Sequence, residues 1–327
     1  MTGGAESEVV DLDCGLPQGS SLGPLKFIVY AAEMQEVVNR RGVSFYGFAD
    51  DSQLVKHMLV NGIDAGKHAV IDYITDIERW CRSHGLKLNA DKSDVIWLGS
   101  RQQLVKINQA DRNLHLPSGT LRASETVRNL GVIIDQHLTF EAQARACSKA
   151  CFYHLRRIRQ IKRFIDDSSL QMLVQAFTTT RLDYCNGLLV NCSVVVRKRM
   201  QRIQDSAARL VCSEPARSHA APLLHRLHWL PVDKRITYKL CVLMFDVYHG
   251  TSPVYLTDLC SRCNDHRLRS SARGDFVVRR ARTRLADSSF TIAGPAAWNS
   301  LPVYSRTINS HDSFCRQLKT YLFSLSG

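Results

Sequence analysis

The spacing of apolar residues predicts a front half that mixes helices and strands. Apolar residues recur at helical spacing over 25–38 and 64–84, and the second run places Ile71, Ile74, Ile77 and Trp80 on one face. Gly85 follows this run, at the position where a helix end favours glycine. Short apolar or β-branched runs predict strands at 43–48, 53–58, 95–98 and 130–134.

After residue 140 the pattern becomes mainly helical. Helices are predicted at 141–164, 168–179, 194–211, 232–248 and 310–325. Asp167, Ser168 and Ser169 precede Leu170 and offer an N-cap region for the second of these helices. Short β-like pieces are predicted at 276–278 and 289–292, within an arginine-rich stretch. The fold class that follows is α+β.

Charge divides the 327 residues into two unlike halves. Residues 1–140 hold 14 basic and 17 acidic residues, whereas 141–327 hold 29 basic and 13 acidic ones, within a net charge of +13. A length of this order corresponds to about two domains. A basic half of this size favours binding to nucleic acid or to another anionic surface, although a solvated basic face is the simpler alternative.

Composition also indicates the cellular compartment in which the protein is expected. No window offers the ~20 consecutive apolar residues of a membrane span, so no membrane partner is expected. The first 13 residues are acidic, unlike the basic start of a secretory signal. Eleven cysteines, an odd number and singly scattered, favour buried free thiols over a disulfide framework. We therefore expect the cytoplasm, the nucleus or both.

Two adjacent carboxylates are the sharpest chemical feature. Asp50 and Asp51 follow Phe48 and Ala49 between two predicted strands, which fits a hairpin turn. Carboxylate oxygens suit Mg²⁺ or Mn²⁺, and paired carboxylates can hold the two ions of a phosphoryl-transfer site. Taken alone, an Asp-Asp pair is more often an ordinary acidic turn.

Three further motifs lie around this pair in a fixed order. They are Gly15-Leu16-Pro17-Gln18-Gly19-Ser20, the stretch Gly85-Leu86-Lys87-Leu88-Asn89 with Lys92, and Leu130-Gly131-Val132-Ile133. Together with Phe48-Ala49-Asp50-Asp51 they resemble motifs B, D, E and C of the palm of reverse transcriptases from LINE-type (non-long-terminal-repeat), jockey-like retrotransposons. Four motifs in the family's order are a far stronger signal than any one of them.

The resemblance implies roles for individual residues. Asp50 and Asp51 would be the metal ligands for Mg²⁺ or Mn²⁺, and Lys92 would act near the triphosphate of the incoming dNTP. The nucleotide and template contacts would come from Gly15, Pro17, Gln18, Gly19, Ser20, Phe48 and Ala49. A glycine-rich loop lets the backbone approach a bound strand closely, and Ser20 can cap the helix that follows.

The resemblance continues past the palm and divides the chain into three parts. It implies a partial right-hand polymerase palm at 1–138, an antiparallel sheet with helices, then a mostly α-helical basic thumb at 139–214 and a mixed C-terminal region at 215–327. The thumb would hold an RNA template and DNA primer, or an RNA–DNA hybrid, through phosphates. The candidate backbone contacts are Arg156, Arg157, Arg159, Lys162, Arg163, Arg197, Lys198, Arg199 and Arg202.

The C-terminal region carries further stretches that resemble the same open reading frames. They are His228-Trp229-Leu230-Pro231-Val232, Leu268-Arg269-Ser270-Ser271 and the run from Gly294 to Pro302. Cys260 and Cys263 have a spacing that suits zinc, with His266 nearby. Because no second close pair accompanies them, we favour structural thiols over a zinc ion.

One departure from the family changes the expectation for activity. The family's motif A carries a further catalytic Asp several tens of residues before motif B, and Asp11 and Asp13 lie too close to Gly15 to fill that place. A two-ion site without that carboxylate binds metal weakly and positions substrate poorly. We therefore expect a fragment without motif A and fingers that polymerises little or nothing alone.

Two alternatives remain beside the polymerase fragment. One is a non-catalytic nucleic-acid-binding protein that uses the basic helices, and the other is an inert remnant of the element. The polymerase fragment and the non-catalytic binding protein differ in whether Asp50 and Asp51 matter, since phosphate contacts make binding salt-dependent whatever the carboxylates do. The sequence carries no signal for an oligomeric state.

Overall fold

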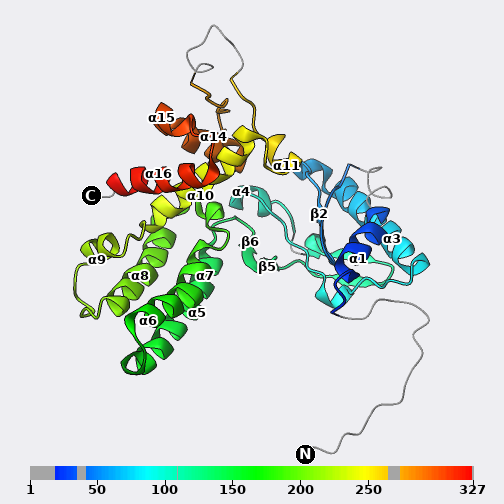
Figure 1. The fold of residues 1–327 in the computed structure, drawn as a ribbon. Helices are drawn as coiled ribbons and strands as arrows, with labels where there is room; N and C mark the ends of the chain where they lie inside the picture. The colour runs from blue at the N-terminus through cyan, green and yellow to red at the C-terminus, as the bar shows by residue number, and fades with distance from the viewer. Residues whose placement is uncertain (1–18, 35–41, 109, 264–272, 326–327) are drawn as a thin grey trace, which may run out of the picture. The chain divides into compact units, whose positions relative to one another are not determined.

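The computed structural model describes residues 19–34, 42–108, 110–263 and 273–325, and they form two compact units. The first unit ends at Glu125 and the second begins at Thr126 (Figure 1). Both mix helices with small antiparallel sheets, which confirms the α+β class. The three-part division at 138 and 214 stays a prediction.

The first unit combines short strands with one long helix. Its elements are α1 (Gly23–Ala32), β1 (Ser44–Phe48), β2 (Asp51–Val55), η1 (Val60–Gly62), α3 (Ile63–Ser83), η2 (Ala90–Lys92), α4 (Arg101–Leu104), η3 (Ala110–Arg112), β3 (Leu114–Leu116) and β4 (Gly119–Leu121). β1 pairs with β2 and β3 with β4, both antiparallel. Within the described residues, each of these sheets has two strands.

Helix α3 forms the core of the first unit. Tyr73, Ile77 and Trp80 are buried against the β1–β2 hairpin, which confirms the predicted apolar face. Gly85 follows the helix with a φ of +66°, and the amide of Leu86 donates to the carbonyl of Cys81 at 2.8 Å. This is the hydrogen bond of a glycine-terminated helix end, as the sequence predicted.

The second unit is mostly helical. Its elements are β5 (Thr126–Asn129), β6 (Val132–Asp135), α5 (Glu141–Ile161), η4 (Lys162–Phe164), α6 (Asp167–Val174), the π-helical η5 (Gln175–Thr179), α7 (Thr180–Asp183), η6 (Asn186–Leu189), α8 (Val194–Val211), α9 (Ala220–Arg226), α10 (Val232–His249), α11 (Val254–Thr257), α13 (Arg284–Asp287), α14 (Phe290–Asn299), α15 (Val303–Arg306) and α16 (His311–Ser324). Helices α5 to α8 lie side by side (Figure 1).

Helix α10 joins two apolar clusters of the second unit. On one side Leu240 packs with residues of α5 and α8, including Cys151 and Ile203. On the other side Met244 packs with Trp298 of α14 and with α16. Helix α10 therefore links the apolar cluster of the predicted thumb to that of the predicted C-terminal region, because it contributes to both.

Several local predictions were wrong. Residues 95–98 form a single bridge from Val95 to Ala123 rather than a strand, and 289–292 begin helix α14. Phe276 makes one isolated bridge to Arg262 in place of a strand. The N-cap of α6 is Asp166, one residue before the predicted cap region. The β-branched runs matched the strand pattern but do not continue into a ladder, whereas the cap of α6 is decided locally, by the bonds from Ser169 to the Asp166 carboxylate.

No helix in the described ranges is both long and apolar enough to span a membrane.

Candidate active site and nucleic-acid interface

The hairpin that carries the two aspartates has one buried face and one open face. Phe45 and Leu54 lie opposite each other and pack toward α3. Because side chains alternate along a strand, Phe48 and its partner Asp51 lie on the other face. That face is open: Phe48 is 64% exposed and Asp51 is exposed.

The turn itself explains how the adjacent aspartates differ. Ala49 and Asp50 form the two-residue connection, and Ala49 adopts a positive φ of 53°. Asp51 is already the first residue of β2, so its side-chain direction is set by the strand. Asp50 lies in the turn and is exposed. The predicted hairpin is confirmed, with Asp51 in the strand rather than in the turn.

The two carboxylates alone do not complete a two-ion site. Within the described part of the chain, no group of three or more His, Cys, Asp or Glu side chains is placed to hold a metal ion. The side chains of Asp50 and Asp51 have no hydrogen-bond or ion-pair partner there. The residues present supply two of the hard oxygen ligands that Mg²⁺ or Mn²⁺ requires and leave the remaining positions to other groups.

The loop before α1 is described only from Gly19 onward, so Gly15, Pro17 and Gln18 lie outside the described residues. Gly19 has a φ of +87°, a conformation that glycine adopts at little cost. Ser20 does not cap the helix, contrary to the prediction. The N-cap of α1 is Leu22 and receives no side-chain bond. The Ser20 hydroxyl is buried without a partner among the described residues.

Lys92 ends the short helix η2 and is exposed. The turn around it is held locally, because the Ser93 hydroxyl donates to the carbonyl of Asn89 at 2.9 Å. No ion pair joins Lys92 to either aspartate in the described part of the chain. Its role at a triphosphate stays a prediction.

The β5–β6 hairpin contains the Leu-Gly-Val-Ile motif and packs on the helices of the second unit. Leu130 and Gly131 form its turn with φ values of 43° and 81°, the sign that two-residue hairpin turns favour. The Tyr184 hydroxyl donates to the Leu130 carbonyl at 2.6 Å, and its ring lies 3.6 Å from where a Gly131 side chain would begin. Gln143 accepts a bond from the Ile133 amide at 2.9 Å.

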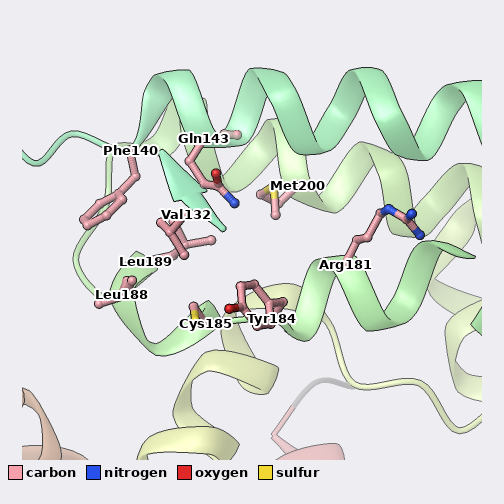
Figure 2. Close-up of a pocket in the computed structure, with 10 residues that line it drawn as sticks. Val132, Phe140, Gln143, Arg181, Tyr184, Cys185, Leu188, Leu189 and Met200 are labelled. Atoms are coloured by element: carbon pink, nitrogen blue, oxygen red, sulfur yellow. The ribbon is translucent and has the colours of Figure 1, made fainter. Parts of the chain in front are cut away.

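A small cavity lies where this hairpin meets the helices (Figure 2). Val132 and Gln143 line it from one side and Tyr184 and Leu189 from the other. Its volume is about 10 Å³, which holds a single water molecule at most. The cavity is therefore a packing gap rather than a substrate pocket.

Sequence reasoning missed the residues that hold this hairpin. Besides Tyr184 and Gln143, the Asp135 carboxylate accepts bonds from the amides of His137, Thr139 and Phe140. These bonds organise the connection into α5. An Asp followed by Thr shortly before a helix is a local capping signal that could have indicated it. Tyr184, about 50 residues away in the sequence, left no such signal.

Helices α5 and α8, with the short helix η4 that follows α5, carry the predicted basic surface. Most of its members are exposed, and α8 places its buried residues on the opposite face. The exposed ones are Arg156, Arg157, Arg159, Arg163, Arg197, Lys198 and Arg202. Arg199 is partly buried. None of them forms an ion pair within the described residues, so their charges are free to meet an anionic ligand.

Lys162 is engaged differently from its neighbours. Its ammonium group donates to the carbonyl of Leu210 at 2.6 Å and to the hydroxyl of Ser213 at 2.7 Å. Those groups lie at the C-terminal end of α8, where a cation stabilises the helix. Lys162 thus joins two helices, and a phosphate would have to compete for it.

The cysteines that the structure describes are all free. Cys81, Cys147, Cys151 and Cys241 are buried, and Cys185 is exposed. Burial raises the pKa of the Cys241 thiol to about 12, so it stays protonated at neutral pH. These buried side chains act as small apolar groups in the core.

The candidate zinc pair lacks the other ligands of a zinc site in the described residues. Cys260 is half-buried, with its sulfur 3.8 Å from that of Met244. Burial raises the pKa of Cys260, which disfavours the thiolate that zinc requires. The Cys263 amide donates to the carbonyl of Asp275. His266 lies outside the described residues.

Comparison with known proteins fits the motif order. Residues 2–134 match the family described as "Reverse transcriptase (RNA-dependent DNA polymerase)". This match confirms the predicted resemblance of these residues to reverse transcriptases.

Two curated relatives come from Drosophila melanogaster. One is described as "Probable RNA-directed DNA polymerase from transposon BS"; it is 25% identical over 150 residues, 44% of this chain and 16% of that protein. The other, "RNA-directed DNA polymerase from mobile element jockey", is 24% identical over 142 residues, 42% of this chain and 15% of that protein. The chain thus spans a small part of each relative's length. No solved structure matches.

Proposed function

We propose that this chain is part of an RNA-directed DNA polymerase of a LINE-type retrotransposon. In this proposal the β1–β2 hairpin presents metal-binding carboxylates, and helices α5 and α8 hold the template–primer duplex. The observation that carries the proposal is the alternation of side chains along the hairpin. Its apolar face is buried on α3, while Asp51 lies on the open face beside the turn. The matched reverse transcriptase segment supports it.

The chemistry assigned to this site is nucleotidyl transfer. Bound divalent ions would stabilise the attacking 3′-oxygen and the leaving pyrophosphate oxygen. The chain's own part is to fix Asp51 on a strand whose other face is packed, which sets the side of the hairpin from which the carboxylate projects. A third carboxylate would have to come from outside the described residues. We therefore propose that the 327-residue chain binds template–primer but extends it poorly.

Primer extension tests this proposal. The assay uses an RNA homopolymer template with a DNA primer, in Mg²⁺ and then in Mn²⁺. Variants are Asp50→Ala and Asp51→Ala, with Asp94→Ala as the matched loss of one exposed carboxylate. Salt-dependent binding of the template–primer with little extension is expected. Extension abolished by Asp50→Ala but not by Asp94→Ala would contradict the incomplete site.

Binding distinguishes the remaining outcomes. If the chain is a polymerase part, Arg157→Gln and Arg202→Gln weaken template–primer binding while the aspartate variants leave metal-free binding unchanged. A chain that shows no salt-dependent affinity for template–primer overturns the assignment of α5 and α8 and favours an inert remnant.

A further inference from the structure

An arginine-rich segment leads from Gly274 into helix α13 and lies outside the helices assigned to the duplex. Residues 273–284 contain five arginines, no lysine and one acidic residue, Asp275. The structure describes 277–282 as an irregular connection without helix or strand. We call residues 277–282 the arginine segment.

The start of this segment is fixed by two adjacent side chains of α14. The Asn299 carboxamide accepts from the Phe276 amide at 2.9 Å and donates to the Phe276 carbonyl at 2.7 Å. It therefore pairs with Phe276 as a neighbouring strand would. The Trp298 indole donates to the Gly274 carbonyl at 3.0 Å, and the Phe276 ring is buried against Trp298.

The glycine at this point permits a close approach. Gly274 has a φ of +68°, and a side chain there would begin 2.9 Å from the Tyr248 hydroxyl. On the other side, the amide of Val277 donates to the Ser261 carbonyl at 2.8 Å. The backbone before the segment is thus held by hydrogen bonds on both sides.

The acidic residue of the stretch is already neutralised. Asp275 forms an ion pair with Arg306, whose side chain is only 5% exposed, and the Asp275 side chain is 16% exposed. Because Asp275 is already paired with Arg306, it does not screen the positive charges of the arginine segment.

The far end of the segment is also anchored. The Thr283 hydroxyl accepts from the Ala286 amide at 3.2 Å and caps α13. The Asn191 side chain donates to the Asp287 carbonyl at 3.0 Å. Both ends are therefore tied to the helical body, which reduces the ordering cost when a ligand binds.

The side chains between these anchors face solvent. Arg279, Arg280 and Arg282 are exposed, and none has a hydrogen-bond or ion-pair partner within the described residues. Val277 and Val278 beside them are 42% and 43% exposed. The segment presents guanidinium groups next to a small apolar surface.

We propose that the arginine segment is a second nucleic-acid contact, which binds the phosphodiester backbone of a single strand. Arginine binds phosphate oxygens in a bidentate manner and stacks on bases, and the five basic residues from 273 to 284 are all arginine. The exposed valines offer apolar contact to unpaired bases, whose faces a duplex hides. The inference stands on the C-terminal region and does not depend on the aspartate hairpin.

Fluorescence anisotropy with the full chain tests it. The probes are end-labelled single-stranded uridine and thymidine 20-mers and a duplex of equal length. The variant is the triple Arg279→Gln, Arg280→Gln and Arg282→Gln. Its matched control, Arg82→Gln with Arg101→Gln and Arg122→Gln, removes the same charge from exposed arginines of the first unit.

The segment variant is expected to lose about tenfold in single-strand affinity at moderate salt. The slope of log affinity against log salt falls by about two, the value for three lost contacts on a single strand. The control changes both quantities much less. Equal loss on the RNA and DNA strands indicates backbone recognition, and a larger loss on RNA adds a contact to the 2′-hydroxyl.

Other outcomes overturn the proposal. Equal affinities for the variant and the control show that only net charge matters. Loss of binding to phosphatidylserine vesicles, with single-strand affinity unchanged, makes the segment a membrane contact instead. If the segment variant loses affinity for the duplex alone, the arginine segment belongs to the same duplex-binding surface as α5 and α8. Arg157→Gln tests that surface separately. Matching thermal unfolding of both triple variants and the unchanged chain excludes misfolding as the cause.

Discussion

The hydroxyl of Tyr184, at the end of α7, donates a 2.6 Å hydrogen bond to the carbonyl of Leu130 in the β5–β6 turn. We expect Tyr184→Phe to lower the free energy of unfolding by about 1 kcal/mol, the usual worth of one such bond. Tyr184→Ala should lower the free energy of unfolding further, because the ring also packs on Gly131. Urea unfolding measures both.

Tyr153→Phe is the control for this prediction. Tyr153 is 58% exposed, close to the 53% of Tyr184, and its hydroxyl makes no hydrogen bond in the described part of the chain. An equal effect of the two phenylalanine variants would contradict the importance of the Leu130 bond.

Asn299→Ala removes both bonds to the Phe276 backbone. Unpartnered buried polar groups are costly, so a loss of about 2 kcal/mol is expected. Hydrogen exchange gives a local readout, since the Phe276 amide should lose its protection. Asn309→Ala, at an exposed asparagine without such bonds, should leave both quantities unchanged.

Lys162→Gln separates a structural lysine from a phosphate contact. Because Lys162 binds Leu210 and Ser213, the change should lower the free energy of unfolding by about 1 kcal/mol and leave the salt slope of template–primer binding almost unchanged. Arg157→Gln should do the reverse. If Lys162→Gln instead reduced the salt slope of template–primer binding and left stability unchanged, Lys162 would be a contact to the duplex.

Asp166 makes the contribution of helix α6 to folding stability depend on pH. Hydrogen bonds from the Ser169 amide and hydroxyl hold the pKa of its carboxyl below the usual 3.8. The Asp166 carboxylate therefore binds a proton less readily in the folded state than in the unfolded state. The stabilisation is present above pH 3.8 and is lost as pH falls through the lowered pKa.

Asp166→Ala should flatten this part of the stability curve below about pH 4. Asp167→Ala is the control, because Asp167 lies in the same helical turn and makes no such bonds in the described residues. Thermal unfolding between pH 2.5 and 6 compares the two. An unchanged acid limb for Asp166→Ala would show that the cap contributes nothing.

The helices were the most predictable part of the fold, because their signals are local. Helix α8 begins and ends where the apolar spacing predicted, with the Ser193 hydroxyl accepting from the Val196 amide at its start. The hairpin around Asp51 was equally clear from two apolar runs and a short turn. A pattern of this kind depends on neighbours in the sequence, which the chain itself displays.

What the sequence concealed depends on distant partners. Residues 95–98 have strand-like composition but find only one bridge. Asn299 gave no sign that its amide would replace a strand for Phe276, since the two lie 23 residues apart. In the sequence Lys162 cannot be told from its exposed arginine neighbours, because its partner at the end of α8 lies far away along the chain. Such roles follow from packing and not from residue type.

The register of the β1–β2 hairpin makes its chemistry sensitive to the number of residues in the turn. If one residue is inserted before Asp51 and the hairpin keeps its two-residue turn, β2 slips by one position, so that Asp51 pairs with Gly47 on the side of Ile77 and Trp80 and Leu54 moves to the open face. Insertion of two residues restores the side. As long as the turn keeps two residues, an odd insertion therefore removes Asp51 from the open face even when both aspartates are kept.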